Sequence, residues 1–124
     1  MPQAAVVSVV DDDESVRNAL DSLLRSNGYT VRTYADAETF LASSGPHDTR
    51  CLISDIQMPG MSGTQLHDEL SARGMNIPVI FITGFQGTPP PLNLHSPEPI
   101  AYFPKPFSCA ELIACLEDVF NHLN

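Results

Sequence analysis

The sequence predicts an α/β fold in which a parallel sheet lies between two layers of helices, a doubly wound sandwich. Five short runs rich in β-branched residues alternate with segments of helical period, the order typical of βαβ units. The runs span residues 5–10, 29–33, 51–56, 77–83 and 100–103. The first, third and fourth runs lack alternation of apolar and polar residues, which is expected of central parallel strands that helices cover on both faces.

The segments between these runs carry helix signals. In the first, apolar residues from Val16 to Leu24 recur at intervals of three and four, and Asn27-Gly28 follows as a stop. Two later segments open at Ser62 and Ser108 with capping boxes, in which the serine hydroxyl and an acid or amide three residues on satisfy free backbone N–H groups. The last segment places its apolar residues on one side: Leu112, Ile113, Leu116, Phe120 and Leu123.

Length and composition limit the possible functions. The 124 residues fit a single domain, 1–124. With 15 acidic and 6 basic residues the net charge is −9, so direct nucleic-acid binding is not expected. The three cysteines have neither a disulfide-framework nor a zinc spacing. No signal peptide is recognised, and no apolar run approaches the ~20 residues of a membrane span, so a cytoplasmic protein without membrane contact is predicted.

Polar residues follow the predicted strands at one edge of the sheet. Asp11 and Asp12 end the first run, Asp55 the third and Thr83 the fourth, and Lys105 follows the fifth. Ligands of doubly wound sheets bind at the carboxyl ends of the strands. Three carboxylates within ~4 Å of one another would repel by about 4 kcal/mol per pair at an effective dielectric constant of ~20, so a cation is expected among them. Oxygen ligands with room for water favour Mg²⁺.

These residue types together fit phosphoryl transfer. A Mg²⁺ beside a carboxylate, with a lysine ammonium and a threonine hydroxyl facing it, can neutralise the charge of a transferring phosphoryl group. The attacking carboxylate then becomes an aspartyl phosphate. Taken singly, each of these residues is more often a cap or a solvated charge, and it is their shared place at strand ends that supports the function.

The chain resembles a response-regulator receiver domain over residues 4–124. The resemblance is carried by V-V-D-D after the first strand, D-I-Q-M-P-G-M-S-G at 55–63, I-T-G at 82–84 and K-P-F at 105–107. The stretches D-x-x-V-R and I-P-V-I-F-I-T-G are similar to those of nitrogen-fixation and nitrate-type regulators. The resemblance implies a flavodoxin-like (βα)5 fold with strand order 2-1-3-4-5. It also implies a switch that a sensor histidine kinase or a phosphotransfer protein phosphorylates.

The resemblance assigns roles in phosphoryl transfer residue by residue. Asp55 would accept the phosphoryl group from a phosphohistidine, Thr83 would bond to that group, and Lys105 would pair with it. Thr83 and Tyr102 would form the switch that reports phosphorylation. In this view the protein takes part in its own phosphorylation and slow dephosphorylation, and is not an enzyme.

The resemblance also assigns the metal ligands. Asp12 and Asp55 would bind Mg²⁺ directly, Asp11 would bind it through water, and Gln57 would offer its backbone carbonyl. Asp13 falls where the family often has Glu. It is predicted to be a surface charge at a helix N-terminus, where the helix dipole favours an acid.

One segment departs from the family. Pro89, Pro90, Pro91, Pro97 and Pro99 occupy the place of the fourth helix, and each proline inside a helix costs ~3 kcal/mol. The fourth helix is therefore predicted to be short, irregular or absent. Because the family makes dimer and output contacts through this region, the face formed by residues 86–124 is the predicted site for a homodimer, an output domain or another partner.

Two alternatives from other classes remain. One is a receiver-like protein-interaction module that acts without phosphorylation, which the proline-rich departure suggests. The other is an aspartate-nucleophile phosphatase, although that class requires D-x-D and the second position here is Gln57. The four histidines lack metal spacing and are predicted to be surface side chains, and Cys109 and Cys115 to be small apolar fillers.

Overall fold

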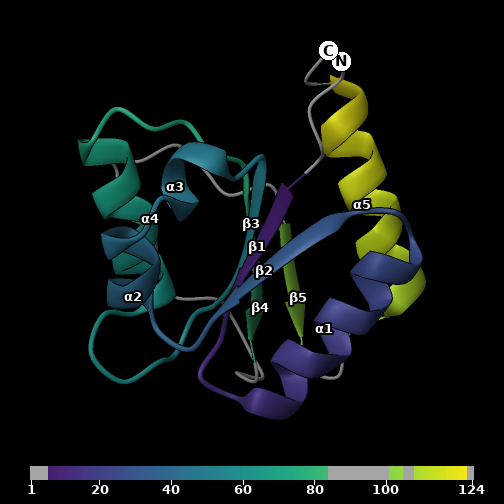
Figure 1. Ribbon diagram of the computed structural model, residues 1–124, viewed down its shortest axis with the longest axis horizontal. Coiled ribbons are helices and arrows are strands. Elements are labelled where there is room, and N and C mark those ends of the chain that lie inside the picture. Colours follow the sequence, from purple (N-terminus) through teal and green to yellow (C-terminus); the bar gives the residue numbers. More distant parts are fainter. Residues whose placement is uncertain (1–5, 84–100, 105–107, 123–124) are drawn as a thin grey trace.

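The computed structural model describes residues 6–83, 101–104 and 108–122, and its central feature is one parallel sheet (Figure 1). The sheet has five strands in the order β2-β1-β3-β4-β5, which confirms the predicted topology. The strands are β1 (Val6–Val10), β2 (Thr30–Tyr34), β3 (Cys51–Asp55), β4 (Val79–Thr83) and β5 (Ala101–Pro104). The helices are α1 (Glu14–Ser26), α2 (Ala37–Ala42), α3 (Gly45–Asp48), α4 (Gly63–Ala72) and α5 (Cys109–His122).

Helices cover both faces of the sheet, with α1 and α5 on one side and α2, α3 and α4 on the other (Figure 1). Successive residues of β1 point to opposite faces, so Val7 and Val9 pack beneath α1 and α5 while Val10 packs beneath α2 and α4. All five residues of β1 are buried. Two covered faces explain why this strand lacks apolar and polar alternation.

The predicted first helix is α1, and its ends lie where the sequence signals place them. Asp13 caps its N-terminus, and the chain leaves the helix through Asn27 and Gly28, which has a φ of 90°. Leu20 and Leu24 are completely buried against the sheet. None of the helices in the described part of the chain combines the length and the apolar composition that a membrane-spanning segment requires.

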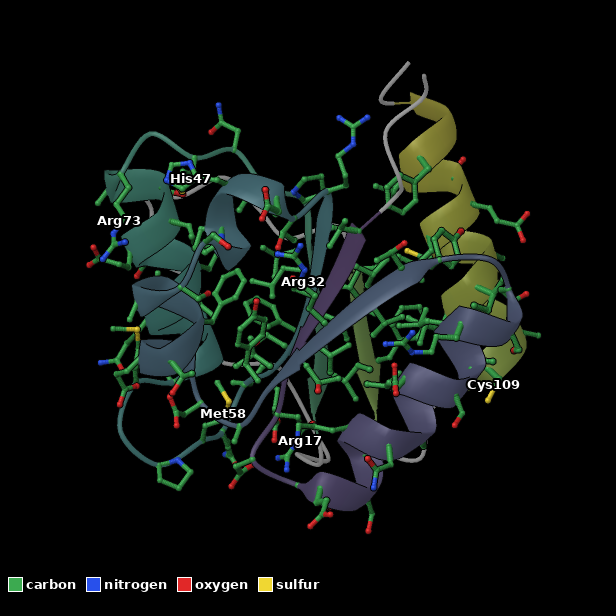
Figure 2. The ribbon with its side chains drawn as sticks, viewed as in Figure 1. Arg17, Arg32, His47, Met58, Arg73 and Cys109 are labelled. Carbon is green, nitrogen blue, oxygen red and sulfur yellow. The ribbon has the colours of Figure 1, made fainter. Side chains whose placement is uncertain are left out.

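Two side-chain predictions need correction. His67 on α4 is buried, with 4% of its surface exposed, because it lies edge-on to Phe81 of β4 with the ring centroids 6.1 Å apart. His47 is exposed as predicted. Cys109 is exposed at the start of α5 and fills no apolar space (Figure 2). Cys115 is partly buried and packs against the core, as predicted.

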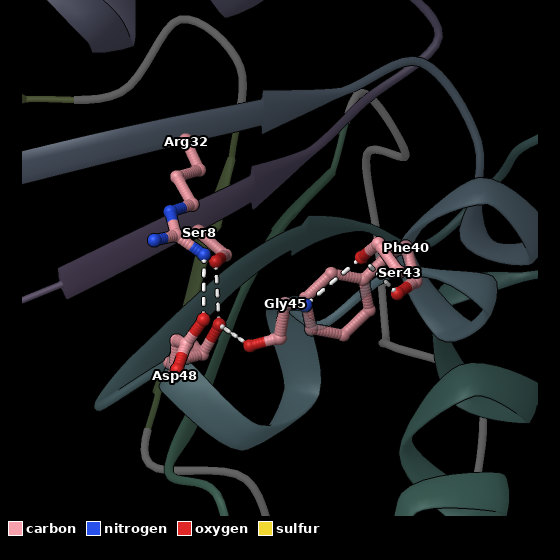
Figure 3. A network of polar contacts seen from close by, with 7 residues as sticks. Ser8, Arg32, Phe40, Ser43, Gly45 and Asp48 are labelled. Carbon is pink, nitrogen blue, oxygen red and sulfur yellow. Dashed lines mark hydrogen bonds and ion pairs between the residues drawn. The ribbon is translucent and has the colours of Figure 1, made fainter.

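The short helix α3 was not predicted, and tertiary contacts hold it in place. The Thr49 hydroxyl donates to the Gly45 carbonyl oxygen at 2.6 Å and lies 2.5 Å from the Ser8 hydroxyl oxygen of β1 (Figure 3). Arg32 of β2 donates to Asp48 at 2.8 Å. These partners come from distant parts of the chain, so a local sequence signal for this helix is weak.

The prediction for the helix between β4 and β5 falls on residues 84–100, which lie outside the described part of the chain. The same is true of Lys105.

Candidate functional site

Two neighbouring strands bring three of the predicted site residues together. β1 pairs in parallel with β3, with Val10 opposite Ser54, so the residues that end these strands lie at the same edge of the sheet. Asp11 follows β1 and Asp55 ends β3. One carboxylate oxygen from each of Asp11, Asp12 and Asp55 lies within 4.8 Å of the others. We call these three residues the acidic cluster.

The members of the acidic cluster differ in their exposure. Asp11 is 1% exposed and Asp55 6% exposed, while Asp12 faces solvent. Backbone donors support the two buried carboxylates: the Asp13 N–H donates to Asp11 Oδ1 at 2.8 Å, and the Gln57 N–H donates to Asp55 Oδ1 at 3.3 Å. Close carboxylates offer hard oxygen ligands to a cation.

Asp13 has a separate task from its two neighbours. Its Oδ1 accepts hydrogen bonds from the N–H groups of Ser15 at 2.9 Å and Val16 at 3.4 Å, and so caps α1. Asp13 is not one of the three residues that form the acidic cluster. The run of three aspartates therefore divides into two members of the cluster and one helix cap.

Gly63 is a residue of the site that the sequence analysis did not single out. It opens α4, and its N–H donates to the Ile56 carbonyl oxygen at 2.9 Å. A Cβ atom at this position would collide with the backbone carbonyl oxygen of Asp55. The signal was present as the last glycine of D-I-Q-M-P-G-M-S-G, and its physical cause is this close approach of two backbones.

The loop from β3 to α4 is held by contacts at the end that leads into α4. Glu38 of α2 accepts a hydrogen bond from the Met61 N–H at 3.3 Å, and Gly60 before it has a φ of 76°. Ser62 caps α4, and Gln65 completes the predicted capping box. The loop that follows Asp55 therefore has a defined path.

The remaining predicted residues lie on the neighbouring strands or outside the described chain. Thr83 ends β4, one residue beyond Ile82, which pairs with Asp55. Tyr102 lies in β5 and pairs with Phe81. Gln57 is exposed and lies two residues beyond the end of β3. The backbone thus places Thr83 at the same edge of the sheet as the acidic cluster.

Comparison with known proteins gives consistent matches. The chain is 38% identical over 116 residues to the transcriptional regulatory protein FixJ of Azorhizobium caulinodans, covering 94% of this chain and 55% of FixJ. The crystal structure of FixJ-N superposes with a TM-score of 0.81 at 35% identity, covering 99% of this chain and 98% of that one. The chain spans about half the length of the first curated relatives it matches.

Two further matches are a structure solved with a bound Mg²⁺-BeF group and the model of a protein family. TrrA of Thermotoga maritima, solved in complex with Mg²⁺-BeF, has a TM-score of 0.80 at 26% identity, covering 93% of this chain and 98% of TrrA. Residues 7–117 match the model of the response regulator receiver domain. The chain therefore belongs to the receiver domains of two-component response regulators.

Proposed function

We propose that the chain is a signalling switch in which Asp55 accepts a phosphoryl group from a phosphohistidine with the help of Mg²⁺. The observation that carries the proposal is the acidic cluster, in which Asp55 lies within 4.8 Å of two further carboxylates at the carboxyl edge of the sheet. A sensor histidine kinase or a phosphotransfer protein is the expected donor, since this is how the family's phosphorylation proceeds.

The metal ligands would be Asp11, Asp12 and Asp55, with the backbone carbonyl of Gln57. Mg²⁺ commonly binds one or two carboxylates together with water and a phosphate, and the donor set here consists of oxygens alone. TrrA, which is similar to this chain, was solved with Mg²⁺-BeF. When bound, the metal would neutralise charge on the carboxylates and on the transferring group.

The chemical step proposed for Asp55 is an in-line displacement. A carboxylate oxygen of Asp55 attacks the phosphorus, the P–N bond to the donor histidine breaks, and the electron pair returns to the imidazole. Thr83 and Lys105 would stabilise the phosphoryl oxygens. The phosphatase alternative needs a general acid two residues after the nucleophile, and Gln57 has no ionisable group.

The same proposal extends to the domain organisation, the switch residues and the partners of the protein. We propose that residues 1–124 fold as one receiver domain in the cytoplasm and that Thr83 and Tyr102 form its switch. The face formed by residues 86–124 would contact a second copy, an output domain or another partner.

A phosphorylation assay tests the function. The protein is incubated with acetyl phosphate and Mg²⁺, and its intact mass is followed. We expect a gain of one phosphoryl group. This gain should not occur when EDTA removes the metal before the reaction, and it should be absent in Asp55→Asn. Asp13→Asn serves as the matched control, because it makes the same chemical change at an aspartate outside the acidic cluster, and it should be phosphorylated as wild type. Labelling that persists in Asp55→Asn would remove Asp55 from the role.

A further inference from the structure

Arg17 reaches from α1 to the peptide bond that joins two members of the acidic cluster. Its Nη1 donates to the backbone carbonyl oxygen of Asp11 at 2.7 Å, and the side chain is half-buried. That carbonyl belongs to the peptide between Asp11 and Asp12. Arg17 lies at the edge of the sheet where β1 ends (Figure 2).

The segment between Asp11 and Arg17, which this hydrogen bond connects, is folded tightly. The Arg17 backbone N–H donates to the Asp13 carbonyl oxygen at 3.0 Å, and the Asp13 N–H donates to the Asp11 carboxylate at 2.8 Å. The helix, its cap and the carboxylate are therefore connected through consecutive bonds. The Arg17 guanidinium adds the contact that fixes the direction of the Asp11 carbonyl, and hence the plane of the Asp11–Asp12 peptide.

Three other arginines of the described chain are used differently. Arg25, Arg32 and Arg73 each form an ion pair with an exposed or nearly exposed carboxylate, at distances of 2.6 to 2.9 Å. Exposed pairs of this kind contribute little to stability. Arg25 also donates to the backbone carbonyl oxygen of Val31. Arg17 donates to the backbone carbonyl oxygen of Asp11, which lies beside carboxylates that would repel one another.

We infer that Arg17 is a positioning residue for the metal site: by holding the Asp11–Asp12 peptide, it keeps both carboxylates directed towards Asp55. The inference rests on the proposed function, because it concerns the same Mg²⁺ site. Partners that orient metal ligands from outside the first coordination sphere commonly change metal affinity by about 10- to 100-fold when removed.

The direction in which Mg²⁺ affinity changes when Arg17 is replaced distinguishes a positioning role from an effect of its positive charge. Removing a positive charge beside a cation site should tighten Mg²⁺ binding if the guanidinium acts through Coulomb repulsion alone. Removing a positioning contact should weaken Mg²⁺ binding although the protein becomes more negative. The two explanations therefore predict opposite changes in the dissociation constant for the same substitution.

The test is a titration with Mg²⁺ alone, followed through the amide NMR signals of residues 11–13. We expect Arg17→Met, which keeps much of the apolar stem, to raise the dissociation constant about 10-fold. Arg17→Lys, which retains the charge and one donor, should recover part of the loss. Arg25→Met removes the same charge from the same helix and should leave Mg²⁺ binding unchanged, because Arg25 bonds Asp21 and the Val31 carbonyl away from the cluster.

The outcomes separate the two proposals. If Arg17→Met binds Mg²⁺ as tightly as wild type or more tightly, the inference is overturned while the metal site stands. If the wild type shows no response to Mg²⁺, both the inference and the proposed metal site are overturned. If Arg17→Met does not fold, Arg17→Lys decides: unchanged affinity in that variant contradicts a role for the guanidinium geometry, and weaker binding supports it.

Discussion

The backbone of Gly63 lies against the backbone carbonyl of Asp55, so closely that no Cβ atom fits between them. The nearest atoms to such a Cβ all belong to the backbone of Asp55 and Ile56. Backbone atoms cannot rotate away as a flexible side chain can. The contact between Gly63 and Asp55 therefore fixes the start of α4 relative to the backbone of the proposed phosphoacceptor.

Gly63→Ala should disturb both stability and the site. We expect the free energy of unfolding to fall by about 1–3 kcal/mol, the usual cost of an added methyl group in a filled space. The rate of phosphorylation by acetyl phosphate should fall as well, because the Asp55 carbonyl must move. Urea denaturation and the intact-mass assay measure the two effects.

Gly74→Ala is the control for this experiment. Nothing lies within 4 Å of a Cβ at Gly74, but its φ of 76° disfavours any L side chain. This variant should lose about 1 kcal/mol from backbone strain and be phosphorylated normally. Equal losses of phosphorylation in both variants would show that general destabilisation, and not the Gly63 contact, is responsible.

Asp13 should contribute to the stability of α1 and not to Mg²⁺ binding. Asp13→Ala removes the cap of α1 and should cost about 1 kcal/mol of unfolding free energy, whereas Asp13→Asn keeps a capping side chain and should cost little. Both variants should bind Mg²⁺ nearly as wild type, while Asp12→Ala should lose binding. Loss of Mg²⁺ binding in Asp13→Asn would place this third aspartate in the metal site.

The buried His67 predicts a loss of stability in acid. Burial lowers the pKa of His67 below its ordinary value of about 6.5, an effect that Asp68 partly opposes. Within the described part of the chain, its Nδ1 meets no hydrogen-bond partner. Above pH ~6.5 the group is neutral in both states and contributes no pH dependence. As the pH falls below that value, the unfolded chain takes up the proton first, so stability is lost until the pH passes the lower pKa of the folded state.

Variants of two histidines test this assignment. His67→Leu should reduce the decline in unfolding free energy between pH 7 and pH 5 and should not lower stability at pH 7, since the unpaired Nδ1 is removed. His47→Leu makes the same substitution at an exposed position and serves as the matched control. An unchanged acid profile in His67→Leu would mean that other groups cause the decline.

The three cysteines should react with alkylating reagents in a fixed order. Cys109 is exposed, whereas burial raises the pKa of Cys51 to about 12 and also raises the pKa of Cys115. Because the thiolate is the reactive form, iodoacetamide at pH 8 should modify Cys109 first and Cys51 only on unfolding. Peptide mass spectrometry follows each site, and Cys109→Ser should remove the fast phase. Modification of Cys51 in the folded protein at a similar rate would contradict its burial.

Much of this fold was predictable because its signals are local or periodic. The apolar strands β1, β3 and β4, the spacing of Leu20 and Leu24, and the cap at Ser62 depend on short stretches of sequence. The convergence of Asp11 and Asp55 followed from a rule for parallel sheets, in which strand ends meet at one edge.

The features that were missed depend on tertiary contacts. The helix α3 is held by Ser8 and Arg32, which lie in other elements, so four residues of sequence do not reveal it. The absence of metal spacing among the histidines predicts a surface position for His67, yet the packing of α4 against Phe81 buries it. The role of Gly63 could not be predicted without the path of the preceding loop, because that path brings Gly63 against the backbone of Asp55.

Chemical mapping of the phosphoryl group tests directly whether Asp55 is the phosphoacceptor. After incubation with acetyl phosphate and Mg²⁺, borohydride reduction converts a phosphoaspartate to homoserine, which peptide mass spectrometry locates. We expect homoserine at position 55 in the presence of Mg²⁺ and none at Asp11, Asp12 or Asp13. Homoserine at one of those three residues, or no reduction product in a sample that carries the phosphoryl group, would contradict the assignment of Asp55 as the acceptor.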